Sequence, residues 1–243
     1  MEIVISIGTS HPWNVAGTGR DLVVGAEFGA RVFTAIAAVS AQDGKGVHAL
    51  AAVASDLFAA QLAALPWSSA GAVRVGALPT AAAVRGVAEA LRAHPWIPAI
   101  VDPVFAASRG GELADAGARQ AFREEIATLP NAIVMPNLEE AATMLGSDAV
   151  TRENIGEAAA ALRARGAFAV LVKGGHLADG EPADALATAE GIEIFAEPRI
   201  AGRMHGTGCT LAMALACELA RGTPLADAVR AARAYVRDEI ARH

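Results

Sequence analysis

The sequence predicts an α/β fold in three layers, α/β/α, with a mostly parallel central sheet. Short apolar runs rich in β-branched residues alternate with longer alanine-rich stretches, an alternation typical of β-α units. Several short runs, such as Ala132-Ile133-Val134-Met135, are apolar at every position, as expected of strands covered on both faces. No linker, low-complexity segment or internal repeat interrupts the 243 residues, so residues 1–243 are expected to form a single domain.

The strands and helices follow from these patterns in order along the chain. β-branched and apolar runs predict strands, and alanine-rich stretches with apolar residues three or four apart predict helices. Strands are expected at 2–7, 32–38, 73–76, 98–102, 132–135, 168–172 and 192–195, and helices at 20–29, 51–64, 80–93, 115–128, 138–145, 154–165, 208–221 and 225–241. Ligands of such sheets collect at the carboxyl ends of the strands, so the residues that follow the strands are the first functional candidates.

Composition excludes several classes of protein. Hydrophobic residues make up 53% of the chain, yet no apolar run is long enough to span a bilayer. The net charge of −6 argues against a nucleic-acid surface. The first residues enter a strand-like pattern directly and lack the basic region of a signal peptide. We therefore expect a cytoplasmic protein that acts on small molecules.

The most specific motif is the stretch 203–212, Arg-Met-His-Gly-Thr-Gly-Cys-Thr-Leu-Ala. Gly206 and Gly208 flank Thr207, Cys209 follows, and a helical pattern starts at once. Glycines let backbone N–H groups face a ligand, and a helix start adds unpaired donors and a positive dipole end. This combination favours a bound phosphate. The side chain at 209 would lie where the phosphate transfers, which favours phosphoryl transfer over phosphate storage.

The two cysteines receive different interpretations. Cys209 is either a small core residue or, because it lies at a helix N-terminus, a thiol with a lowered pKa or a hydrogen-bonding role at the reacting centre. Cys217 lies two turns further along the same predicted helix and is taken as core. The rise between them is about 12 Å, which is too long for a disulfide. This cysteine usage fits a reducing compartment.

Three polar motifs follow predicted strands. Asn137 and Glu140 open a helix and either form its N-terminal cap or hold Mg²⁺ directly or through water. Lys173 either is solvated in a turn or meets nucleotide phosphates. Asp102 either starts a turn or orients Mg²⁺ or its water.

Gln42 and Asp21 carry weaker signals on their own. The amide of Gln42 donates and accepts at once, which suits a ring nitrogen beside an amino group, although most glutamines are solvated. Asp21 lies on a predicted helix, where a surface carboxylate is the ordinary interpretation.

Taken together, these motifs resemble the ribokinase-like superfamily and, within it, the hydroxymethylpyrimidine/phosphomethylpyrimidine kinases of thiamin biosynthesis. The resemblance spans nearly the whole chain in order. Its motifs are Asp21, Ala41-Gln42, Arg74-Val75-Gly76-Ala77-Leu78, Asp102-Pro103-Val104, Pro136-Asn137-Leu138-Glu139-Glu140, Lys173-Gly174-Gly175-His176-Leu177 and 205–211. Most of the superfamily carries an aspartate at position 209. A cysteine there, within HGTGCT, is typical of the pyrimidine kinases and of some pyridoxal kinases.

The resemblance implies ATP and Mg²⁺ as cofactors and phosphorylation of 4-amino-5-hydroxymethyl-2-methylpyrimidine, its monophosphate, or both. It implies an anion hole made by Gly206, Gly208 and the N–H of Cys209, with the thiol against the substrate hydroxyl. The other implied roles are Lys173 and Thr207 on ATP, Asn137 with Glu140 and Asp102 around Mg²⁺, and Gly8, Asp21, Gln42 and Val104 on the acceptor. It also suggests a homodimer, built through the edge of the substrate-side sheet.

The chain departs from the family on the acceptor side. The family signature GSDPSGGAGIQADL corresponds here to residues 8–22, with one residue inserted and with Trp13, Asn14 and Val15 in place of Ser-Gly-Gly. The lysine and methionine of the family's KIGML segment are Arg74 and Ala77. These changes are either a compensating repacking or a change of acceptor. Two alternatives therefore stay open, a kinase for a B6 vitamer and a pyrimidine-binding protein without catalysis.

Overall fold

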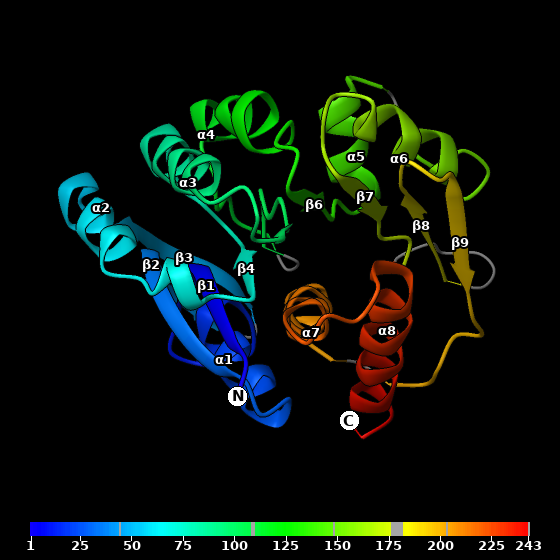
Figure 1. Cartoon of the computed structure of the whole chain (residues 1–243), viewed down its shortest axis with the longest axis horizontal. Helices are drawn as coiled ribbons and strands as arrows, with labels where there is room; N and C mark the ends of the chain where they lie inside the picture. The colour runs from blue at the N-terminus through cyan, green and yellow to red at the C-terminus, as the bar shows by residue number, and fades with distance from the viewer. Residues whose placement is uncertain (44, 108–109, 148, 176–181, 203, 243) are drawn as a thin grey trace.

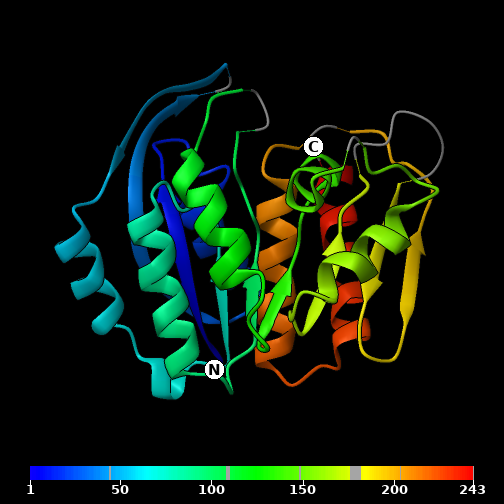
Figure 2. The same cartoon turned by 90° about the horizontal axis from the view of Figure 1, so that it is seen from above.

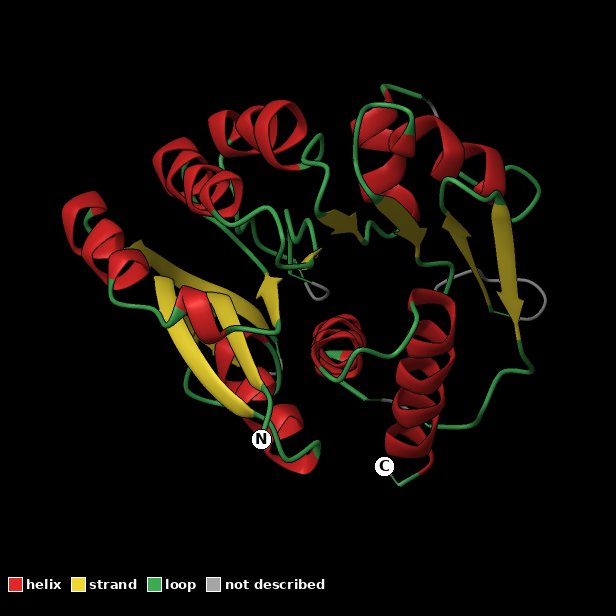
Figure 3. Cartoon of the chain, in the orientation of Figure 1, coloured by secondary structure: helices red, strands yellow, loops and turns green. Residues whose placement is uncertain are grey.

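A nine-stranded sheet lies between two layers of helices in the computed structural model, which describes residues 1–242 apart from 44, 108–109, 148, 176–181 and 203 (Figures 1 and 3). The order is β3-β2-β1-β4-β5-β6-β7-β8-β9. The pairs from β2 through β7 are parallel, while β3, β8 and β9 join antiparallel. The strands are β1 (Ile3–Ser10), β2 (Arg31–Asp43), β3 (Gly46–Ala52), β4 (Ala72–Val75), β5 (Ala99–Val101), β6 (Ala132–Val134), β7 (Ala169–Val172), β8 (Ala183–Ala187) and β9 (Ile192–Ala196).

Two apolar cores, one on each face, hold the helices to the sheet. Five helices cover one face: α2 (Ser55–Ala63), α3 (Ala81–Ala93), α4 (Ala116–Ala121), α5 (Leu138–Leu145) and α6 (Ile155–Arg163). The other face is covered by α1 (Gly17–Glu27), α7 (Thr207–Ala220) and α8 (Leu225–Ala241). The central strands are buried along their whole length, because both faces of the sheet are packed. The three-layer α/β/α expectation is confirmed.

Two strands lie where the sequence pattern did not predict them. The sequence predicts a helix over 51–64, but residues 46–52 form strand β3 and helix α2 starts at Ser55. Residues 183–187, Ala-Asp-Ala-Leu-Ala, form the buried strand β8. Both segments are alanine-rich and lack β-branched side chains, apart from Val47, so their strand conformation comes from pairing with β2 and with β7 and β9.

The parallel strands end at one edge of the sheet, where the candidate site lies. Figure 2 shows the β2–β3 hairpin reaching past the rest of the sheet at this edge. Gly111, in the loop after β5, would place a Cβ 2.9 Å from Cβ of Val47 on this hairpin. The hairpin and that loop therefore form a wall beside the carboxyl ends of the strands. No described helix is long and apolar enough to cross a membrane.

Candidate active site

A row of alternating charges runs along the carboxyl edge of the sheet, and we call it the charge row. Its members, in spatial order, are Asp21 on α1, Arg74 on β4, Asp102 after β5, Lys173 after β7 and Glu140 on α5. Arg74 Nη1 lies 3.4 Å from Asp21 Oδ2, and its Nη2 lies 3.6 Å from Asp102 Oδ2. The other oxygen of Asp102, Oδ1, lies 2.5 Å from Lys173 Nζ. Each predicted carboxylate thus has a cation beside it.

Arg74 is the centre of the charge row and was not among the predicted site residues. Its side chain is 1% exposed, and its guanidinium lies among Asp21, Asp102 and the Cys209 sulfur. Burial alone would lower its pKa, but Asp21, Cys209 and Asp102 outweigh that effect and raise it. The sequence held a signal, because Arg74 interrupts the apolar strand Ala72–Val75. A charge in a strand buried on both faces needs counter-charges close by.

Space for the guanidinium depends on Gly76. A Cβ at this position would lie 2.0 Å from Arg74 Nη1. Gly76→Ala is therefore expected to displace Arg74 from its two carboxylates and to lower the free energy of unfolding by about 1–3 kcal/mol, the usual cost of overpacking. Urea unfolding measures it. Gly86→Ala is the control, since a Cβ there has only ordinary contacts, and equal stability of Gly76→Ala and wild type would contradict this role for Gly76.

The glycine loop before α7 is shaped as the sequence predicts. Gly206 is the N-cap of α7 with φ +74°, and a Cβ there would lie 2.0 Å from the carbonyl oxygen of Val15. Gly208 faces the charge row, because its Cβ would lie 3.5 Å from Lys173 Nζ and 3.7 Å from Asp102 Oδ2. Thr207 is the first residue of α7. The first-turn amides of the helix thus lie beside an ammonium whose side chain is 14% exposed, which is a favourable arrangement for binding an anion.

Cys209 lies in this first turn, with its sulfur close to the Arg74 guanidinium and hydrogen-bonded to the backbone of Gly17. Burial raises its pKa, and Arg74 only partly offsets that effect. The expectation of a lowered thiol pKa is therefore wrong, because desolvation outweighs the helix N-terminus and the arginine. The alternative, a hydrogen-bonding role, agrees with these contacts. Cys217 is buried in the core, as predicted.

Asn137 and Glu140 cap α5 reciprocally. Asn137 Oδ1 accepts from the Glu140 amide, and Glu140 Oε2 accepts from the Asn137 amide, both at 2.8 Å. The capping interpretation is thus confirmed for both residues. Burial raises the pKa of Glu140 to about 7, against the opposing charge of Lys173. No group of three His, Cys, Asp or Glu side chains within the described part of the chain forms a cage for a metal.

The raised pKa predicts a pH effect that Glu140→Gln removes. Folding shifts the pKa of Glu140 from 4.5 to about 7, so the folded state keeps a proton that the unfolded state has released. Between these values the free energy of unfolding of the metal-free protein should fall as pH rises. Glutamine cannot ionise but retains an oxygen for the Asn137 amide. Urea unfolding at pH 5 and pH 7.5 should therefore show the variant gaining stability relative to wild type, and a constant difference would contradict this.

The predicted acceptor residues are partly brought together. Asp21 is buried and accepts from Ser6 Oγ at 2.6 Å, and Gly8 lies beside Arg74, its Cβ position 3.5 Å from Nη1. Val104 follows Asp102 on the loop beside the hairpin. Gln42 lies apart from the charge row, opposite Val47 on the hairpin. Its contact with an acceptor stays a prediction.

The altered N-terminal loop is ordered against the glycine loop. His11 Nε2 lies 3.1 Å from the carbonyl oxygen of Ala16, and Val15 packs on Gly206. Trp13 is 58% exposed while Ala77 is buried, so the tryptophan does not fill core space beside Ala77. This observation disfavours a compensating repacking between these two residues. His176, Leu177 and Arg203 of the predicted motifs lie outside the described residues.

A family model described as phosphomethylpyrimidine kinase matches residues 12–243. The chain belongs to this family. Among curated phosphomethylpyrimidine kinases, it is 37% identical to the hydroxymethylpyrimidine/phosphomethylpyrimidine kinase of Rhizobium meliloti over 98% of this chain and 90% of that protein. It is 35% identical to the Escherichia coli protein of the same name, again over 98% and 90%.

Solved structures that resemble this chain include a phosphomethylpyrimidine kinase and also pyridoxal kinases. The phosphomethylpyrimidine kinase of Clostridium difficile has a TM-score of 0.86 at 26% identity, covering 99% of this chain and all of that one. The pyridoxal kinase of Staphylococcus aureus in complex with pyridoxal has a TM-score of 0.88 at 26% identity, covering 99% and 88%. The fold is therefore that of the ribokinase-like vitamin kinases.

Proposed function

We propose that this protein transfers the γ-phosphate of ATP to 4-amino-5-hydroxymethyl-2-methylpyrimidine, to its monophosphate, or to both, in thiamin biosynthesis. The observation that carries the proposal is the Lys173 ammonium beside the Gly206–Cys209 loop. A cation beside the first-turn amides of a helix suits the charge that develops on a migrating phosphoryl group. Identity of 35–37% with curated kinases of this name supports the substrate.

On the donor side, the amides of Gly206, Gly208 and Cys209 form the anion hole, and Lys173 and Thr207 bind the phosphates of ATP. Lys173 keeps its proton, because Asp102 and Glu140 outweigh the effect of burial and raise its pKa. Asp102 orients the ammonium by accepting its hydrogen bond. The protein thus supplies fixed positive charge without moving a side chain.

Mg²⁺ accompanies ATP in this proposal. The donor set fits an ion held mainly by water and by the nucleotide, because Glu140 and Asp102 are separate carboxylates with Lys173 between them. Asn137 uses its side-chain oxygen in the cap of α5 and acts by positioning Glu140. The ion would supply further positive charge at the phosphates.

On the acceptor side, the Cys209 thiol lies against the substrate hydroxyl, Gly8 lets the ring approach β1, and Asp21, Gln42 and Val104 bind the pyrimidine. The raised pKa of Cys209 means that its thiol acts as a hydrogen-bonding group.

Cys209→Ser keeps a hydrogen-bonding group at this position. The variant is expected to have a lower kcat in steady-state kinetics and to fold normally, as measured by thermal unfolding. An unchanged kcat would reduce Cys209 to a spacer.

A B6 vitamer is the second candidate acceptor. The loop at 13–15 favours it, since Trp13 is exposed at the altered loop instead of repacking the core. The likeness to pyridoxal kinases of known structure adds to it. Trp13→Gly distinguishes a wall of the acceptor site from a surface residue, because a wall alters the KM of the acceptor and leaves that of ATP unchanged.

A coupled ADP-release assay tests the proposed function. Purified protein with ATP and Mg²⁺ receives hydroxymethylpyrimidine, its monophosphate, pyridoxine or pyridoxal in parallel. We expect turnover with at least one of the two pyrimidines. Turnover with a B6 vitamer alone, or with none of the four, would overturn the proposal.

We further propose that the protein is a cytoplasmic homodimer. Light scattering at low protein concentration tests the assembly, and a mass corresponding to a monomer would contradict it.

A further inference from the structure

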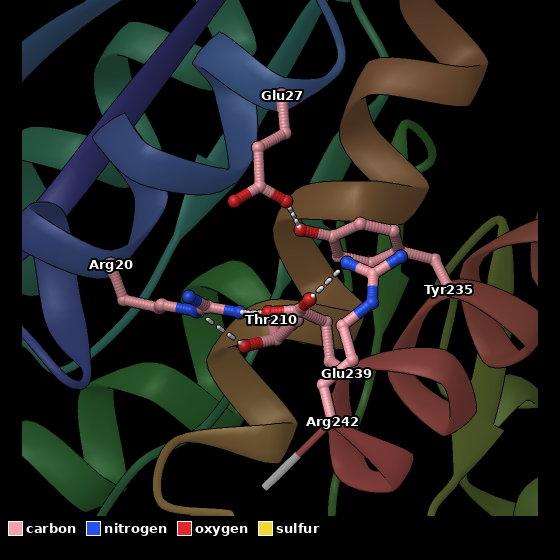
Figure 4. A network of polar contacts seen from close by, with 6 residues as sticks. All are labelled: Arg20, Glu27, Thr210, Tyr235, Glu239 and Arg242. Atoms are coloured by element: carbon pink, nitrogen blue, oxygen red, sulfur yellow. Dashed lines mark hydrogen bonds and ion pairs between the residues drawn. The ribbon is translucent and has the colours of Figure 1, made fainter.

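Arg20 stands next to the acceptor carboxylate Asp21, yet its side chain points into the contact between three helices. Figure 4 shows it crossing from α1 toward α7 and α8. Its Nε donates to Thr210 Oγ1 at 3.0 Å, and its Nη2 donates to Glu239 Oε2 at 2.6 Å. The side chains of Arg20 and Glu239 are 12% and 7% exposed. A pair so shielded from water is screened less by salt than a surface ion pair, and removing one partner leaves the other charge uncompensated.

The two ends of this link belong to the two halves of the site. Arg20 precedes Asp21, and Thr210 follows Cys209. Thr210 is fully buried, and its amide donates to the Gly206 carbonyl at 2.8 Å, which closes the first turn of α7. The hydroxyl and the amide of this one residue thus join Arg20 to the glycine loop. The link spans 190 positions in the sequence.

Glu239 fixes Arg20 from the far side. Its second carboxylate oxygen, Oε1, accepts from Arg242 Nη1 at 2.9 Å. Both oxygens are therefore occupied, and the planar guanidinium of Arg20 is held in one orientation while its Nε reaches Thr210. The family signature has alanine at the position of Arg20, so this chain makes the link with a residue of its own.

We propose that Arg20 is a positioning residue that sets the acceptor helix α1 against the anion hole of α7, acting through Thr210. This inference rests on the proposed function, in which Asp21 holds the acceptor and the Gly206–Cys209 loop holds the migrating phosphate. A nucleophile and a phosphoryl group react only at short distance and in line, so a small shift between the two helices slows transfer without weakening binding.

A second link between α1 and α8, which Arg20 also joins through Glu239, offers a matched control. Tyr235 on α8 donates a hydrogen bond from its hydroxyl group to Oε2 of Glu27, the last residue of α1 (Figure 4). Tyr235→Phe removes this link and keeps the ring against Phe28, whose centroid lies 4.9 Å away. The control therefore loosens α1 from α8 without touching Thr210.

Steady-state kinetics on the pyrimidine acceptors test the proposal. Arg20→Ala and Thr210→Val are expected to lower kcat about tenfold, with the KM of ATP changed less than about twofold. Arg20→Lys keeps the charge but offers one nitrogen in place of the two that reach Thr210 and Glu239, so its kcat should fall between, and Thr210→Ser should restore most of kcat. The double variant should be no slower than either single variant, because the two residues act as one unit. Tyr235→Phe should keep the wild-type kcat.

Three kinetic results would overturn the proposal: a wild-type kcat in Arg20→Ala, an equal loss in Tyr235→Phe, or losses that multiply in the double variant. A second measurement does not depend on the acceptor. Hydrogen exchange of the amides at 206–210 in the free protein should quicken in Arg20→Ala and stay unchanged in Tyr235→Phe. If wild type turns over neither pyrimidine, the proposed function fails, and hydrogen exchange still decides the inference: unchanged exchange in Arg20→Ala overturns it.

Discussion

Lys173→Met should lower kcat on the order of 10²–10³-fold, the size of effect found when a donor to transition-state charge is removed. Lys173 is the cation beside both Gly208 and Asp102. Methionine retains most of the volume and removes the charge, which leaves Asp102 and Glu140 without the ammonium between them. Steady-state kinetics give the loss, and calorimetry with ADP shows how much of it lies in nucleotide binding.

Lys173→Arg is the matched variant. It keeps the charge but replaces a compact ammonium with a wider planar group, so its kcat should lie between those of wild type and Lys173→Met. A Lys173→Met enzyme within about threefold of wild type would remove this lysine from the catalytic machinery.

The largest effect on stability is expected at Arg74. Arg74→Met leaves Asp21 and Asp102 buried with their shared cation gone, and breaking a buried pair in this way costs about 3–5 kcal/mol. Burial already raises the pKa of Asp21 against the opposing charge of Arg74, so loss of the arginine should raise it further. The folded variant then holds a proton that the unfolded chain releases, and its stability deficit should grow as pH rises.

Urea unfolding measures the deficit at Arg74, with two controls. Arg74→Lys keeps a cation between the carboxylates, as in the family's KIGML segment, and should restore most of the stability. Arg85→Met removes a largely exposed arginine that pairs with Glu125, and should change stability by less than about 1 kcal/mol. Equal stability in Arg74→Met and Arg85→Met would contradict the central place of Arg74.

The sequence predicted the conformation of the glycine loop well, because the loop is one contiguous segment. The loop consists of the contiguous residues 206–209. A glycine turn that leads into a helix predicts exposed first-turn amides, which can bind an anion. Lys173 and Asp102 were predicted because each follows a strand, and parallel strands end at the same edge. Their 2.5 Å contact follows from that topology.

Other features depend on contacts between distant residues and were not predicted. The alanine-rich strands β3 and β8 form through their pairing partners, so their own propensities mislead. The pKa of Cys209 rises because of burial, and burial is a property of the packed site. Arg74 and Arg20 gain their roles from carboxylates and hydroxyls far away in the chain. An arginine in an apolar strand signals that counter-charges lie close by, but it does not identify them, and an arginine on a helix gives no such signal.

A competition assay tests the central claim most directly. Equal concentrations of hydroxymethylpyrimidine and pyridoxal are mixed with ATP, Mg²⁺ and limiting enzyme, and the phosphorylated products are separated by mass. The ratio of products gives the ratio of the two kcat/KM values. We predict that pyrimidine phosphates dominate, and a product consisting only of pyridoxal phosphate would contradict the account.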